Sequence, residues 1–217
     1  MAHEIETLFY TRQKPWHGLG VMVAEALSSS EALTISGLDW SVNQQPIYTE
    51  TGHLIPNYKA NVRDKDSAIL GVVSDRYAIV QNKSAFEFTD NLLGNGVKYE
   101  TAGSLQGGRR VWLLAKLPER YIINGENIEP FIVFSNSHDG SAAITVAMTP
   151  IRVVCQNTLN LALRQAKRAW SAKHTGNIAG KLHEAQETLE LAHGYMSELG
   201  KEIDILNRIK LSDSKAM

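Results

Sequence analysis

Alternating hydrophobic and polar positions dominate the chain between about residues 38 and 148, and they predict a strand-rich body. Alternating or continuous apolar runs occupy residues 38–42, 58–63, 68–73, 97–102, 109–116, 130–135 and 142–148. Glycine-rich or Asn-Gly turns follow several of these runs, as at residues 103–108, 124–125 and 136–140. Short strands joined by tight turns pair antiparallel, so we expect a mainly antiparallel sheet.

Helical spacing interrupts the alternation twice within this body. Serines at 28–30 can cap a short helix over 32–36, which Gly37 ends, and Ser84 can cap a helix over 85–93, which Gly94 ends. The first 25 residues have few periodic apolar positions. We expect them to form an irregular N-terminal arm whose Trp16 packs into the body or against another subunit.

The apolar period changes after Pro150. The spacing from Val154 to Ala169 predicts a helix of about 20 residues, which is rich in basic side chains. A second amphipathic helix begins near Ile178 and runs to about Leu211, with a face that packs on the body or on another subunit. The predicted fold class is therefore α+β, with one domain over residues 1–175 and a helical extension over residues 176–217.

Composition narrows the class of protein further. With 217 residues, 43% of them hydrophobic, the chain is long enough for a real core. The single cysteine, Cys155, excludes an internal disulfide and a cysteine-based zinc cluster. No apolar run approaches the roughly 18 residues of a membrane span, and the first residues carry acids rather than an apolar leader. We expect a soluble, cytoplasmic protein without a membrane partner.

Charge is distributed unevenly along the chain. The 44 residues from Gly140 to His183 contain six lysines and arginines and no Asp or Glu, although the whole chain has 22 basic and 23 acidic residues. A near-neutral protein that gathers positive charge in one segment is typical of proteins with a polyanionic partner. The alternative is a solvated basic face that pairs with glutamates of the C-terminal helix.

Four separated motifs stand out along the chain, at residues 16–20 (WHGLG), 75–82 (DRYAIVQN), 136–141 (NSHDGS) and 149–159 (TPIRVVCQNTL). Together they resemble the phage/plasmid-like protein family, a family without an assigned activity. The resemblance covers about residues 10 to 200 and implies an origin on a phage, prophage or plasmid. The order of strands, hairpin and basic helix is also similar to that of phage single-strand annealing proteins, although only at the level of architecture.

The predicted basic helix is the first candidate binding site. Arg164, Lys167 and Arg168 can share one helix face, with Trp170 beside them and Lys173 shortly after. Cations that track phosphates, next to an aromatic ring that stacks on a base, are the combination that binds single-stranded nucleic acid.

The glycine hairpin at residues 107–110 is the second candidate. Its glycines let backbone N–H groups approach a phosphate, and Arg109 or Arg110 adds charge, although a strand points the two arginines to opposite faces. Arg152 could complete a groove with them. A plain glycine turn with solvent-facing arginines is the alternative.

Catalysis is the competing interpretation of two motifs. His138 and Asp139 could act as a base and its orienting partner, and Cys155 could act as a nucleophile at a helix N-terminus. Asn, Asp and Gly are also what a tight turn requires, and a lone cysteine among valines is more often buried. One His and one Asp do not make a metal site, and the chain lacks a phosphate-binding loop and a dinucleotide fingerprint. We therefore expect no cofactor.

These patterns favour a non-enzymatic, oligomeric protein that binds single-stranded nucleic acid, DNA rather than RNA, and that anneals or protects strands during recombination. One alternative is a hydrolase that uses Cys155, or His138 with Asp139. The other is an interaction protein or anti-host factor that acts through its C-terminal helix.

Overall fold

Four long strands form the centre of the molecule, and both of their faces carry apolar side chains. They are β6 (Lys98–Leu105), β7 (Arg110–Lys116), β10 (Phe131–Ser137) and β11 (Ile144–Thr149). In β7, every residue from Val111 to Ala115 is buried. Burial on both faces means that a layer of other elements covers each side of the sheet.

The complete sheet has seven strands in the order β12-β11-β10-β7-β6-β1-β2. The outer strands are β1 (Ile5–Thr11), β2 (Val21–Val23) and β12 (Arg168–Ala172). All neighbours pair antiparallel except β1 and β2, which are parallel. The structure is a computed structural model, and it describes residues 4–25, 27–94, 97–117, 121–123, 126–166 and 168–188.

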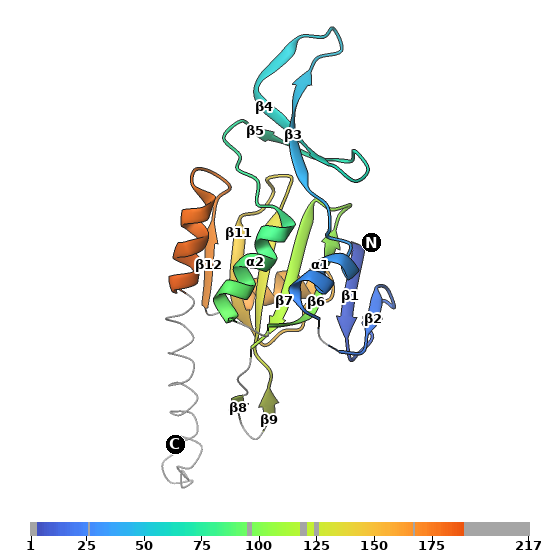
Figure 1. The fold of residues 1–217 in the computed structure, drawn as a ribbon, viewed down its shortest axis with the longest axis vertical. Coiled ribbons are helices and arrows are strands. Elements are labelled where there is room, and N and C mark those ends of the chain that lie inside the picture. The colour runs from blue at the N-terminus through green and yellow to red at the C-terminus, as the bar shows by residue number, and fades with distance from the viewer. Residues whose placement is uncertain are drawn as a thin grey trace, which may run out of the picture.

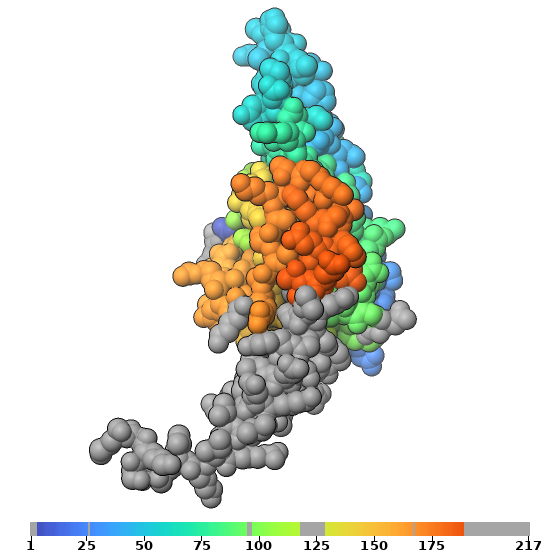
Figure 2. All heavy atoms as spheres, turned by 90° about the vertical axis from the view of Figure 1, so that its left-hand side faces the viewer, coloured from blue at the N-terminus to red at the C-terminus, as the bar shows by residue number. Residues whose placement is uncertain are grey.

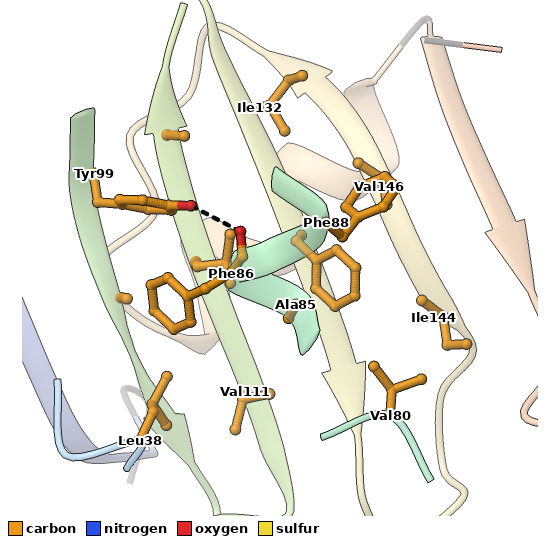
Figure 3. Packing of buried hydrophobic residues seen from close by; sticks show 14 of the residues in the cluster. Leu38, Val80, Ala85, Phe86, Phe88, Tyr99, Val111, Ile132, Ile144 and Val146 are labelled. Carbon is orange, nitrogen blue, oxygen red and sulfur yellow. Dashed lines mark hydrogen bonds between the residues drawn. The ribbon is translucent and has the colours of Figure 1, made fainter. Parts of the chain in front are cut away.

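Helices cover both faces of this sheet. The helices α1 (Ser29–Ile35) and α2 (Asn82–Leu93) lie across one face (Figure 1). Phe86 of α2 packs on Tyr99 of β6 and Phe88 packs on Phe134 of β10. The hydroxyl of Tyr99 donates a hydrogen bond to the Phe86 carbonyl at 3.2 Å (Figure 3). A helix over residues 178–188 joins the same core through Ile178, Leu182 and Ala185.

The helix α3 (Gln156–Gln165) covers the opposite face. Its buried Leu159 and Ala162 pack in a second apolar cluster with Trp112 and Leu114 of β7. Among the described residues, no helix is long and apolar enough to cross a bilayer.

A second, three-stranded sheet projects from one end of the body (Figure 1). It consists of β3 (Val42–Tyr48), β4 (Leu54–Arg63) and β5 (Ile69–Ser74), in the order β3-β4-β5, and it is called the β-arm below. The hairpin of β8 (Tyr121–Ile123) and β9 (Glu126–Ile128) lies at the other end of the body.

The predicted α+β class with mainly antiparallel sheets is confirmed. Two short helices are present near the predicted positions, and Ser28 is the N-cap of α1. The prediction that Ser84 caps the second helix is wrong, because α2 begins at Asn82 with Gln81 as its N-cap. Gly37 follows α1 with φ +68° and Gly94 follows α2 with φ +77°, a left-handed conformation that glycine adopts without strain. The predicted strand over residues 38–42 is wrong, because β3 begins only at Val42. Leu38 and Trp40 are instead buried in the core from an irregular segment.

The expectation of an irregular N-terminal arm is wrong for residues 5–11. This segment forms β1, which pairs with β6, and it buries Leu8, Phe9 and Tyr10. Trp16 does not pack into the body, since it is 68% exposed. Of the predicted C-terminal helix, residues 178–188 are helical, and the remainder lies outside the described residues.

Candidate functional site

The acid-free segment folds into consecutive elements on one side of the molecule. It contains β11, α3, β12 and the first turns of the helix over residues 178–188. Figure 2 shows the part of this segment from α3 onward, coloured orange, across the middle of one side of the body directly beneath the β-arm. Arg164, Arg168 and Lys173 are exposed there. Lys167, which we also expect to contribute, lies outside the described residues.

The prediction of a single 20-residue basic helix is wrong. The helix α3 ends at Gln165, Ala166 has an extended backbone, and residues 168–172 form β12 on β11. Trp170 pairs with Val146 and is only 7% exposed, because alternation along the strand turns its side chain into the core shared with α2. Trp170 is therefore not placed to stack on a base, whereas its neighbours in β12 remain at the surface.

Arg152 neutralises a buried carboxylate. Its Nε lies 2.9 Å from Oε1 of Glu100, whose side chain is 3% exposed, and Arg12 binds the other carboxylate oxygen at 3.0 Å. The guanidinium also donates hydrogen bonds to the carbonyls of Gln13 and Thr11. This side chain ties the N-terminal segment to the start of α3, which is a structural role.

Arg109 and Arg110 diverge, as the strand geometry predicts. Arg109 is exposed, whereas Arg110 lies on the α3 face and donates to Oγ of Ser135 at 3.3 Å and to Oδ1 of Asn160 at 3.4 Å. Burial lowers the pKa of Arg110, and Asp139 acts in the opposite direction. Arg109 thus remains available for a ligand, and Arg110 is held by neighbouring side chains.

The glycine of the same hairpin makes room for an internal arginine. A Cβ on Gly108, which has φ +84°, would lie 2.6 Å from Nη1 of Arg63. Arg63 itself pairs with Glu6 at 3.0 Å and with Asp66 at 2.7 Å. The close approach at Gly108 therefore serves the contact between the hairpin and the β-arm.

The polar motifs at residues 75–82 and 136–141 join the β-arm to the body. Nε2 of His138 bonds Oδ1 of Asn82 at 3.0 Å, and the amide of Asn61 donates to the His138 carbonyl at 2.6 Å. The hydroxyl of Tyr77 donates to the Ser137 carbonyl, and the ring of His174 stacks on Tyr77 at a centroid distance of 4.5 Å. The motifs hold two sheets together through hydrogen bonds to the backbone.

Burial keeps His138 and Cys155 away from the surface. Both are buried, at 0% and 1% exposure, and burial lowers the pKa of His138 to about 3. His138 contacts Trp40 and Asn82 on the α2 side of the large sheet, whereas Cys155 precedes α3 on the opposite side. Asp139 accepts a hydrogen bond from the Ser141 amide at 2.9 Å, as a turn residue does.

An open pocket of about 490 Å³ lies at the base of the β-arm. Its lining comes from β4, β5 and the turn that follows β5: Asn57, Tyr58, Ser74, Asp75 and Arg76. The sequence pattern does not indicate this pocket, because Tyr58 lies in an ordinary predicted strand. Arg76 belongs to the motif at residues 75–82, and nothing else in the sequence distinguishes it.

Backbone contacts connect this pocket to the acid-free segment. Tyr77 forms an antiparallel bridge with Thr175, and the Ala78 amide donates to the His174 carbonyl at 2.9 Å. Arg76 therefore lies one residue from the bridge, and Lys173 lies two residues from it. Figure 2 shows the base of the arm meeting the orange side of the body.

The fold and this surface define an α+β protein with a projecting three-stranded sheet. The acid-free segment, residues 140–183, forms one side of the body, called the acid-free side below, and this side adjoins a pocket. The chain belongs to the family described as Domain of unknown function (DUF932), whose model matches residues 69–217. No curated protein and no solved structure matches the chain.

Proposed function

We propose that this protein binds single-stranded nucleic acid along its acid-free side. The observation that carries the proposal is the exposure of Arg164, Arg168 and Lys173 on consecutive elements that contain no carboxylate side chain. Arg168 is the first residue of β12 and Lys173 directly follows its last residue, so their five-residue separation corresponds to about 17 Å at roughly 3.3 Å per residue. Cations at this distance can contact two separate phosphates of one strand.

The mechanism is electrostatic. Each cation that neutralises a phosphate releases condensed counterions, so the affinity falls as salt rises, with little dependence on sequence. Trp170 does not contribute because it is buried. The finer proposal is that the protein comes from a phage or plasmid and anneals or protects DNA strands during recombination. It rests on the resemblance of the four motifs.

The test is a fluorescence-anisotropy titration of a labelled single-stranded oligonucleotide at several salt concentrations, with a duplex for comparison. We expect the double variant Arg164→Gln/Lys173→Gln to bind more weakly and to flatten the salt slope by about 1.4, since each single-strand phosphate contact contributes about 0.7. Lys83→Gln is the matched control, because Lys83 is 76% exposed but lies on α2 beside Glu87. Absence of binding by the wild type at low salt would refute the proposal.

A second candidate function is self-association through the β-arm. Tyr48, Leu54, Ile69 and Val72 of the arm are each more than half exposed, and exposed apolar side chains in such number are typical of protein contacts. We expect light scattering to give a mass above that of one chain, and the double variant Ile69→Ser/Val72→Ser to lower it. A monomeric wild type at high protein concentration would exclude this candidate.

A further inference from the structure

The pocket at the base of the β-arm carries two unengaged side chains of the kind that bind a nucleotide. Tyr58 is 52% exposed on β4, and Arg76 is exposed in the turn after β5. Within the described residues, neither side chain forms a hydrogen bond, an ion pair or a ring contact. The phenol ring and the guanidinium are therefore both available to a ligand in the same pocket.

The backbone fixes the walls of this pocket. Asn57 has φ +63°, a left-handed conformation that asparagine tolerates, and its carbonyl accepts a hydrogen bond from the Asp75 amide at 2.9 Å. Tyr58 pairs with Ser74 in the ladder of β4 and β5. The next residue after the pocket, Tyr77, is anchored to Ser137 of the body. The pocket thus lies where the arm is held to the large sheet.

The chemistry of the lining fits one nucleotide of a single strand. A tyrosine ring offers a stacking surface to any base, and an arginine offers charge and paired donors to a phosphate. The Asn57 amide and the Asp75 carboxylate can accept hydrogen bonds from base amino groups. A volume of about 490 Å³ is within the range of small-molecule sites.

We propose that this pocket holds one nucleotide of the strand whose phosphates follow the acid-free side. The bridge between Tyr77 and Thr175 makes the two surfaces continuous, since it lies between Arg76 and Lys173. The inference rests on the proposed function. It adds a contact with one base to the electrostatic contacts between the acid-free side and the phosphates. In this arrangement Tyr58 supplies the stacking that the buried Trp170 does not.

The test compares two labelled strands of equal length and charge, one with normal bases and one abasic. We expect the wild type to bind the base-bearing strand more tightly, by roughly fivefold to a hundredfold for one stacked base. Tyr58→Ala removes this preference and leaves the salt slope unchanged, whereas Tyr58→Phe retains it. Arg76→Gln weakens binding to both strands. The matched control is Trp16→Ala, because Trp16 is a 68% exposed aromatic side chain that lies outside the β-arm and outside the pocket.

The possible outcomes distinguish base binding in the pocket from phosphate binding along the acid-free side. Equal binding of the two strands by the wild type overturns the pocket inference while phosphate binding stands. A preference that survives in Tyr58→Ala, with native circular dichroism, also overturns it. If neither strand binds at low salt, the proposed function fails together with the pocket. If Tyr58→Ala misfolds, Arg76→Gln provides the test of the pocket. Unchanged affinity of Arg76→Gln for the base-bearing strand then overturns the inference.

Discussion

Acid should destabilise this protein through His138 in particular. The side chain is fully buried against Trp40 and bonded to Asn82, so that protonation places an imidazolium in an apolar site. Burial is the largest cause of the lowered pKa, the nearby His174 lowers it further, and Asp139 opposes both. The pKa in the folded protein is about 3, against an ordinary value of 6.5.

The sign of the effect follows from this difference. Above pH 6.5 both the folded and the unfolded chain hold a neutral His138, and no stability is lost. Between pH 6.5 and 3 only the unfolded chain takes up the proton, so the free energy of unfolding falls by about 1.36 kcal/mol per pH unit. From pH 7.5 to 4.5 the loss is about 2.6 kcal/mol, a substantial part of the 5–15 kcal/mol typical of a domain.

Urea unfolding of the wild type and of His138→Gln at pH 7.5 and 4.5 measures this loss. Glutamine keeps a donor for Asn82 but does not titrate, so the variant should lose about 2.6 kcal/mol less than the wild type over this interval. His53→Gln, at an exposed position in the β-arm, should behave as the wild type does. Equal losses in His138→Gln and the wild type would refute the reasoning.

Three further substitutions test the structural assignments. Trp170→Ala should cost about 3–5 kcal/mol of unfolding free energy in urea titrations, and the folded variant should bind oligonucleotides as the wild type does. Gly108→Ala should lower stability by about 1 kcal/mol more than Gly107→Ala, because both substitutions strain a positive φ but only the former also adds a Cβ against Arg63; equal melting temperatures would contradict this. Glu100→Gln should cost about 2 kcal/mol in chemical denaturation, less than a fully buried pair, since the two arginines that share the carboxylate are partly exposed.

Local patterns predict the parts of this fold whose partners are close in sequence. The hairpin of β6 and β7 joins strands that a glycine turn connects, and α2 ends where Gly94 permits a left-handed residue. The strand β1 has no such local signal. Its partner residues in β6 lie more than 90 positions away, and nothing in residues 5–11 alone indicates that the sheet will cover them.

The error at Trp170 has a different physical origin. Apolar residues from Val154 to Ala169 lie at helical spacing. The last of them, Ala169, belongs to the strand β12, so its agreement with helical spacing is a coincidence. Extended backbone at Ala166 separates the two elements, and pairing with β11 decides the conformation of the second. Tertiary pairing therefore overrides the local period, and a residue expected on a basic helix face becomes part of the core.

The motifs at residues 75–82 and 136–141 suggest a functional site from sequence alone, but in the structure they lie at the junction between the β-arm and the body. His138, Asn82 and Tyr77 belong to these motifs. Their polar side chains suggest a binding or catalytic role when only the sequence is known. In the structure their hydrogen bonds go to one another and to backbone carbonyls, because an arm that projects from a body needs buried polar contacts to fix its orientation. These groups therefore serve the junction between the arm and the body. The side chains free to bind, Tyr58 and Arg76, flank the junction, and the rigidity of the junction is what would hold them in register with the acid-free side.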